Sequence, residues 1–201
     1  IPSFRRPFPL FKHLLFTLFA QILLIQSSFA QSPGVTLGGE LPGLLPLFPA
    51  DNWWNVDVSH APLDPDGQDY IDFLNNGGNR RLHPDMGGDT GPDSHYGIGY
   101  CVVPGTQPLE PVVFDYDDQS DYGAPERPLG YPIPPEAKTQ PHWIEGGYPG
   151  GGESGDRHML IVDRDHRILY ELYAAYWNPD LSRWEAGSGA IFPLDENRRR
   201  P

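Results

Sequence analysis

Histidine, glutamate and tyrosine side chains recur at spacings that place them on one face of a predicted β-hairpin. Residues 157–173 read RHMLIVDRDHRILYELY, where two apolar runs flank the polar group DRDH. A reversal through a loop of two or four residues within RDHR pairs His158 with Tyr173, because opposed residues of an antiparallel pair share a face. Glu171 lies on that face as well, two residues from Tyr173.

The opposite face of this hairpin is predicted to be the core face. With an even loop it carries only apolar and aromatic residues, namely Met159, Ile161, Ile168, Tyr170, Leu172 and Ala174. A three-residue loop would instead mix Arg157 and Glu171 with core residues. The even loop is therefore preferred.

A His, a carboxylate and a Tyr on one sheet face can act as base, acid or charge stabiliser in breaking a glycosidic linkage. The linkage would break by hydrolysis or by β-elimination. In the alternative interpretation, His158 and Glu171 form a structural hydrogen-bonded pair under a covering loop. The sequence leaves both open.

Two adjacent tryptophans in DNWWNVDVS, residues 51–59, are candidate substrate-binding residues. In an extended chain Trp53 and Trp54 point to opposite sides, so one is expected to enter the core and the other to face outward. An exposed Trp ring stacks on the apolar face of a sugar, whereas a buried one would close the end of a β-sandwich.

Acidic residues in FDYDDQSDYG, at a strand end, form a possible calcium site, since oxygen ligands suit a hard cation. They are Asp115, Asp117, Asp118 and Asp121. A solvated acidic turn is the alternative.

A weaker metal candidate lies in RLHPDMGGD and DSHYG, two Gly-rich stretches that contain His83, Asp85 and His95. If the two loops met, these side chains could hold zinc in a metal-dependent hydrolase, the third functional alternative. Turn-capping by Asp beside Pro also explains LHPD.

The elements that must position these residues are predicted to be mainly β. Short β-rich runs separated by Pro and Gly follow residue 96, among them the continuous runs RILYELYAAYW, residues 167–177, and RWEAGSGAIF, residues 183–192. They indicate an antiparallel β-sandwich, jelly-roll-like, with one short N-terminal helix. Asp64 and Pro65 suit the start of that helix, and NNGGN ends it. The Pro-rich stretch APERPLGYPIPPEAKTQPHW, residues 124–143, is expected to run extended over the surface. Cys101, the one cysteine, is expected to be a buried hydrophobe.

The N-terminus predicts export. Arg5, Arg6 and Lys12 precede an apolar run and then SSFA, so residues 1–30 are interpreted as a secretory signal peptide and the mature protein as extracellular or periplasmic. Residues 31–50 are expected to be a Gly- and Pro-rich linker or strap, and residues 51–201 a single β-rich domain. Because the chain begins with Ile and stops soon after a strand-like run, we expect a C-terminally incomplete fragment.

The charge of the chain limits the classes of partner that it can bind. The formal net charge is -13 at pH 7, which repels nucleic acid and anionic lipid. We therefore expect no nucleic-acid partner and no membrane association after signal cleavage. The sequence contains no Gly-x-Ser-x-Gly elbow and no phosphate-binding loop ending in Lys and Ser or Thr.

Several stretches together resemble an uncharacterised family of secreted bacterial proteins. They are DNWWNVDVS, LHPDMG, YGIGYCVVPG, DRHMLIVDRDHRILYELY and SGAIF, and they extend over residues 51–193. The resemblance implies export and a β-rich fold, and it supplies no activity to transfer. Similar members continue past the end of this chain, and they have an aliphatic residue where Cys101 stands here.

The leading functional hypothesis is a secreted, carbohydrate-active protein that acts on extracellular polysaccharide or cell-surface glycan. His158, Glu171 and Tyr173 would be catalytic, and Trp53 and Trp54 would bind the substrate. The main alternative is a non-catalytic extracellular module that binds glycans or a protein partner. No cofactor is required by either hypothesis, with calcium as the possible exception.

Overall fold

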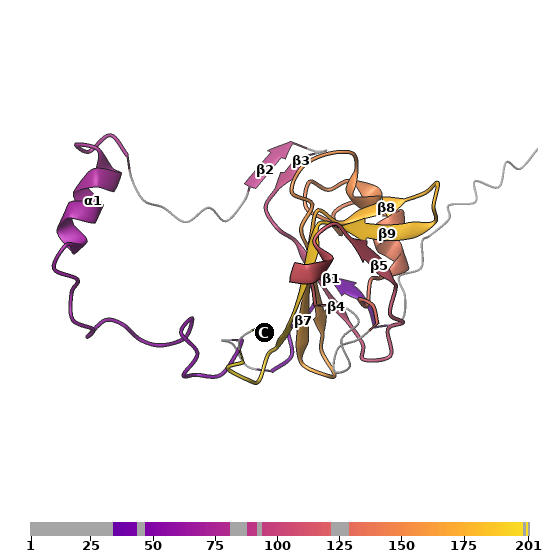
Figure 1. Cartoon of the computed structure of the whole chain (residues 1–201), viewed down its shortest axis with the longest axis horizontal. Coiled ribbons are helices and arrows are strands. Elements are labelled where there is room, and N and C mark those ends of the chain that lie inside the picture. Colours follow the sequence, from indigo (N-terminus) through magenta and orange to yellow (C-terminus); the bar gives the residue numbers. More distant parts are fainter. Residues whose placement is uncertain are drawn as a thin grey trace, which may run out of the picture.

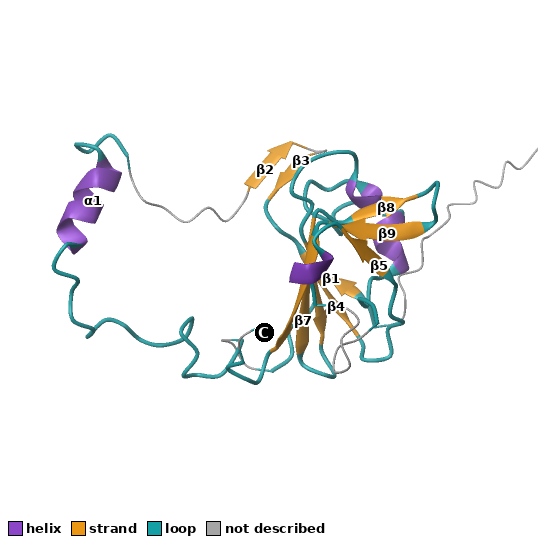
Figure 2. Ribbon diagram, in the orientation of Figure 1, coloured by secondary structure: helices purple, strands orange, loops and turns teal. Residues whose placement is uncertain are grey.

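The computed structural model describes residues 34–43, 47–80, 88–91, 94–121, 129–198 and 200, which form a mainly β protein (Figure 1, Figure 2). Their strands make a five-stranded sheet, a three-stranded sheet and a two-stranded ribbon, and none of these closes into a barrel. The prediction of a mainly β fold with one short α-helix is confirmed for these residues.

The five-stranded sheet has the strand order β1-β4-β6-β7-β10 and carries the predicted hairpin at its centre. The neighbours β4 and β6 run parallel, and the other pairs run antiparallel. The strands are β1 (Thr36–Leu37), β4 (Tyr100–Val103), β6 (Met159–Asp163), β7 (Ile168–Tyr173) and β10 (Ser188–Pro193).

The three-stranded sheet contains a second parallel pair. Its order is β5-β9-β8, formed by Val112–Phe114, Arg183–Ala186 and Tyr176–Asn178, and β5 runs parallel to β9. The expected wholly antiparallel pairing is therefore wrong in both sheets. Residues 104–158, which separate β4 from β6, are long enough to return the chain to the same end of the sheet, as a parallel pair requires.

The β6–β7 hairpin has the predicted register. Leu160 pairs with Glu171, and Asp163 pairs with Ile168, which leaves an even, four-residue loop over residues 164–167. The Asp163 carboxylate stabilises this turn, because its Oδ1 accepts the backbone N–H groups of residues 165 and 166 at 3.1 and 2.9 Å. The core face is as predicted except at Ala174, which has a positive φ of 54° and is only partly buried, whereas Ala175 is buried.

Two strands that the sequence predicts as continuous each divide between the two sheets. Residues 167–177 form β7 and then β8, with the change of direction at Ala174, and residues 183–192 form β9 and then β10, with Gly187 between them. Gly187 donates its backbone N–H to the Tyr173 carbonyl at 2.8 Å, so the two corners lie against each other. Bends of this kind allow a strand to pass from one sheet to the next.

The main core is one apolar cluster to which both sheets and the Pro-rich stretch contribute. Tyr131 and Ile133 are fully buried, and the Tyr131 ring contacts Phe114 of β5 and Tyr170 of β7 at centroid distances of 5.6 and 5.7 Å. The expectation that this stretch runs over the surface is wrong for its described part, residues 129–143. Proline cannot donate to a sheet ladder, and the fully buried Pro132 and Pro134 lie here in irregular backbone.

Cys101 and two tryptophans belong to the same core. Cys101 is buried in β4, as predicted, and burial raises the pKa of its thiol. Trp143 and Trp184 are also buried, and Trp177 packs its ring against Trp184 at 5.6 Å. These tryptophans are therefore packing residues.

Residues 34–43 and 47–50 lie at the edge and on the outer face of the five-stranded sheet. The short strand β1 pairs with β4, and two arginines of the β6–β7 turn hold the segment, with Arg164 donating to the Gly34 carbonyl and Arg167 to the Pro42 carbonyl at 2.8 and 3.2 Å. Leu41, Leu47 and Phe48 pack there against the small apolar cluster around Val102, Val162 and Leu194.

The helix α1 (Gly67–Asn75) extends away from the sheets, and none of its residues is buried (Figure 1). It begins slightly later than predicted, since Asp64 accepts the backbone N–H of Asp66 in a preceding turn at 2.8 Å, and it ends at Asn76 in the left-handed conformation. The ribbon of β2 (Gly88–Gly91) and β3 (Ser94–Tyr96) follows. No helix in the described part of the chain could cross a membrane.

Candidate functional site

The outer face of the five-stranded sheet carries the predicted polar residues. His158 lies one residue beyond the last β6–β7 pair, and its ring contacts the Tyr173 ring at a centroid distance of 5.4 Å. Glu171 lies on the same face, opposite Leu160. The structure thus brings His158 and Tyr173 into contact and places Glu171 beside them, in the arrangement that the even loop predicted.

This outer face is covered at one end and open at the other. Near the turn, Val162 and Leu169 belong to the apolar cluster that Leu41, Leu47 and Phe48 cover. Away from the turn Tyr173 is 41% exposed, and His158 and Glu171 are partly buried. The polar residues therefore remain within reach of a ligand.

A cavity of about 480 Å³ joins Glu171 to the two adjacent tryptophans. Its lining includes Phe48, Asn52, Trp53, Trp54, Glu171 and Arg200. A concave site with aromatic walls and a few polar groups is the usual form of a small-molecule or sugar site. The cavity thus joins the carboxylate predicted from the hairpin to the tryptophans predicted from DNWWNVDVS.

Both tryptophans are exposed, at 63% for Trp53 and 80% for Trp54. The expectation that one of them enters the core is wrong, because the chain turns here and is not extended. The Asn52 side chain holds the turn by accepting the Trp54 backbone N–H at 3.0 Å, and the Asn55 N–H bonds to the Asn52 carbonyl at 2.7 Å. The same Asn52 side chain donates to Asn197 at 2.9 Å, which ties the turn to the end of the described chain.

Partial burial of Glu171 favours its protonated form. Desolvation raises the pKa of this carboxyl above its ordinary value, and the electrostatic interactions with His158 and Arg200 act in the opposite direction. A raised pKa is the direction of shift that suits a carboxyl group to donate its proton to a leaving group.

The sequence did not predict Glu145, which holds His158. The Glu145 Oε2 atom lies 2.6 Å from the ring Nδ1 of His158 and also accepts the His158 backbone N–H at 3.1 Å. Glu145 is 13 residues away in an irregular loop, so neither strand periodicity nor a short motif marks it. Of the two carboxylates beside His158, Glu145 makes the direct side-chain hydrogen bond, and Glu171 interacts with the ring only through space.

The four aspartates of the acidic turn at 115–121 differ in how deeply they are buried. Asp121 is 3% exposed, and its carboxylate accepts hydrogen bonds from Arg200 Nε at 2.9 Å and from the Ile191 backbone N–H at 3.0 Å. Asp115, Asp117 and Asp118 are exposed around the short 3-10 helix Asp117–Gln119. A calcium ion at this turn stays a prediction, and it would compete with Arg200 for Asp121.

The second metal candidate lies largely outside the described residues. His83 and Asp85 are in the part of the chain that is not described, and for His95 only the backbone, in β3, is described. Among the described side chains, no group of three or more His, Cys, Asp or Glu residues is placed to hold a metal ion.

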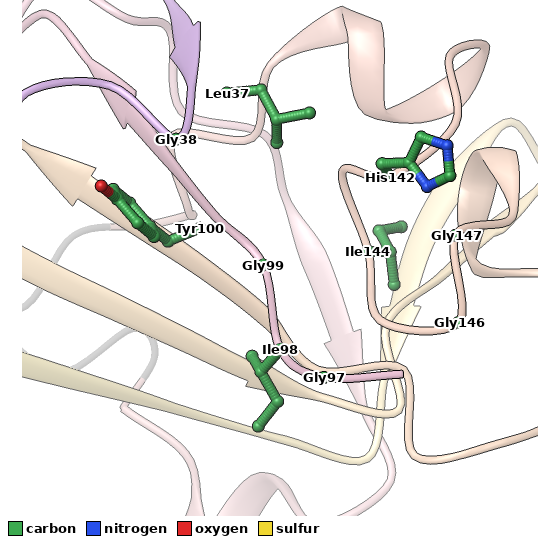
Figure 3. A pocket seen from close by; sticks show the side chains of 10 residues that line it. All are labelled: Leu37, Gly38, Gly97, Ile98, Gly99, Tyr100, His142, Ile144, Gly146 and Gly147. Carbon is green, nitrogen blue, oxygen red and sulfur yellow. The ribbon is translucent and has the colours of Figure 1, made fainter. Parts of the chain in front are cut away.

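A second cavity, of about 410 Å³, lies beside the loop that carries Glu145 (Figure 3). One wall is the chain before β4, with Gly97, Ile98 and Gly99, and the other is the loop with His142, Ile144 and Gly147. None of its lining residues is a carboxylate, so it offers fewer groups for acid–base chemistry than the cavity at Glu171.

Comparison with known proteins gives no relative: the chain matches no family model, and neither the curated proteins nor the solved structures contain a significant match.

Proposed function

We propose that this protein is an exported carbohydrate-active enzyme that binds a polysaccharide in the cavity of Trp53, Trp54 and Glu171 and cleaves a glycosidic linkage at His158, Glu171 and Tyr173. The observation that carries the proposal is that one cavity contains both the exposed tryptophans and a carboxyl group whose pKa is raised. The expected sandwich belongs to the same proposal, supported by the core that the two sheets share.

Two reactions suit these groups. In hydrolysis, His158 takes a proton from water, the water oxygen bonds to the anomeric carbon, and the leaving oxygen takes the proton of Glu171 as the carbon–oxygen bond breaks. In β-elimination from a uronic acid, His158 takes the proton next to the carboxyl group and the electron pair forms a carbon–carbon double bond. The glycosidic oxygen then leaves with the proton of Tyr173.

The test is to incubate the full chain with a panel of neutral and uronate-containing polysaccharides. New reducing ends without ultraviolet absorbance would indicate hydrolysis, and absorbance of an unsaturated product would indicate elimination. We expect His158→Ala and Glu171→Gln to lower the activity by about 10²-fold to 10⁴-fold, the range typical of lost acid–base catalysis. Glu153→Gln, at an exposed position, is the matched control and should retain full activity.

The exposure of both tryptophans also favours a second function, a glycan-binding module without catalysis. Such a module would retain polysaccharides in affinity electrophoresis, lose that retention in Trp53→Ala and Trp54→Ala, and release no product across the panel. Cleavage that is unchanged in His158→Ala and Glu171→Gln would leave the enzyme class standing and reject the proposed catalytic residues.

A further inference from the structure

His158 is held by Glu145 through both backbone and side chain. The Oε2 atom of Glu145 accepts from the His158 backbone N–H at 3.1 Å and lies 2.6 Å from the ring Nδ1, while the Glu145 backbone N–H donates to the His158 carbonyl at 2.9 Å. The carboxylate is thereby fixed relative to the strand from which the imidazole projects, and Tyr173 lies against the same ring. The ring has little freedom to rotate.

The contact also determines which ring nitrogen carries the hydrogen. An ionised carboxylate can only accept a hydrogen bond, so a neutral His158 ring that bonds to it must carry its hydrogen on Nδ1. The other nitrogen, Nε2, then has an available lone pair, and it bonds to no residue that the structure describes. A ring in this state can accept a proton at Nε2, and the carboxylate stabilises the imidazolium that forms.

The loop that carries Glu145 is anchored on both sides of it. Trp143 and Ile144 are buried in the core, and Gly147 closes the loop by donating to the Ile144 carbonyl and accepting from the His142 N–H, both at 3.0 Å. The loop passes the second cavity as a compact turn (Figure 3). A carboxylate on such a support holds its orientation without help from a ligand.

We propose that Glu145 is a positioning residue, which fixes His158 in the Nδ1–H tautomer and presents Nε2 as the proton acceptor of the site. The inference rests on the proposed function for the reaction that Nε2 serves, whereas the fixed tautomer is a property of the free protein. Proton transfer balances in either reaction: Nε2 gains the proton of water or of the sugar carbon, and Glu171 or Tyr173 supplies one to the leaving oxygen.

The first test is nitrogen NMR of the full chain labelled with ¹⁵N-histidine, at alkaline pH, with His158 assigned from the signals lost in His158→Asn. We expect a protonated Nδ1 and an unprotonated Nε2 in the wild type. In Glu145→Ala the hydrogen should move toward Nε2. In Glu145→Gln, which keeps an amide oxygen as acceptor, the Nδ1–H form should persist, and in the control Glu153→Ala the spectrum should be unchanged.

The second test uses a polysaccharide that the wild type cleaves. Glu145→Ala should lower kcat by about 10²-fold or more with KM little changed, and Glu145→Gln should recover part of that loss. An Nε2–H tautomer in the wild type, or an unchanged tautomer in Glu145→Ala, would overturn the inference. A tautomer that moves as expected in a protein that cleaves nothing would support the positioning role of Glu145 and reject the proposed function.

Discussion

The side chain of His166 folds back onto Asp163, and its ring Nδ1 lies 2.7 Å from the carboxylate Oδ2 of Asp163. This bond, together with the negative charge of Asp163, raises the pKa of the imidazole above its ordinary value of 6.5. The stabilisation from this pair is therefore fully present below about pH 6.5 and is lost as the pH rises through the raised folded-state pKa.

We expect His166→Ala to lower the thermal midpoint more at about pH 5.5 than at about pH 9, because the charged ring stabilises the turn more than the neutral ring does. Thermal unfolding of both proteins at the two pH values measures the difference. His60→Ala, at an exposed position, should show no such dependence. An effect of His166→Ala that grows with pH would contradict this account of the turn.

Glu171→Gln should increase stability at neutral pH. Burial raises the pKa of Glu171, so the folded state gains less than the unfolded state from ionisation of this carboxyl group. Stability from this group is full below its ordinary pKa of 4.5 and falls as the pH rises through the folded-state value.

The Glu171→Gln variant, which does not ionise here, should therefore unfold at a higher temperature than the wild type at about pH 8 and match it at about pH 4. Calorimetry at both pH values checks this, with Glu153→Gln as control. A stabilised but inactive variant would be typical of a group kept for catalysis. Equal midpoints at pH 8 would mean that the carboxyl is better solvated than the structure shows.

Trp53→Ala and Trp54→Ala should weaken glycan binding while leaving the fold intact. Each exposed ring offers a flat apolar face to a sugar, and an aromatic stacking contact contributes about 0.5–1.5 kcal/mol, or up to about tenfold in affinity. Because both rings are exposed, unfolding free energies should change by no more than about 0.5 kcal/mol. Titration calorimetry with an oligosaccharide of a retained polymer measures the first effect, and urea unfolding the second.

The Phe73→Ala variant serves as the matched control for these tryptophans. It removes an aromatic ring that is 85% exposed on α1, outside the cavity lining. It should bind the oligosaccharide as the wild type does. Equal losses in all three variants would point to general surface adhesion instead of a site at the cavity.

Gly189→Ala should destabilise the protein by about 1–3 kcal/mol, the usual cost of overpacking a core. A Cβ at Gly189 would clash with the Tyr131 hydroxyl and would lie 2.9 Å from the Phe114 ring. Tyr131 cannot easily retreat, because its hydroxyl donates to the Asp121 carbonyl at 3.0 Å.

Gly67→Ala, at the start of α1, is the control for Gly189→Ala. Its new Cβ would meet nothing closer than 3.8 Å, so the variant should be neutral or slightly stabilised. Urea unfolding of both variants compares them directly. A Gly189→Ala protein as stable as the wild type would show that the space between the sheets is not filled at Tyr131.

The hairpin could be predicted from the sequence because one physical rule determines it. Of the loop lengths considered, only an even loop keeps His158, Glu171 and Tyr173 off the face that carries Met159, Ile161, Ile168, Tyr170 and Leu172, and β6 and β7 adopt that register. The same rule could not show where a strand leaves its sheet. Ala174 and Gly187 change the direction of the chain for reasons of packing, and the β-rich sequence on either side of them looks continuous.

The site was predicted in part for the same reason. Periodicity places His158 and Glu171 on one face, but the hydrogen bond of His158 with Glu145 depends on a loop that returns from the core. Likewise Trp53 and Trp54 are both exposed because the Asn52 side chain closes a turn, an interaction that composition does not reveal. Contacts that depend on irregular backbone carry no periodic signal.

The two corners at Ala174 and Gly187 bear on how the protein unfolds. Since β7 continues into β8 and β9 into β10, each sheet contains two segments that are covalently joined to the other sheet, and Gly187 bonds across the corner to Tyr173. Separating the layers would pull on both crossings at once. The two sheets should therefore melt as one cooperative unit, with α1, which buries none of its residues, exchanging its amide hydrogens long before that transition.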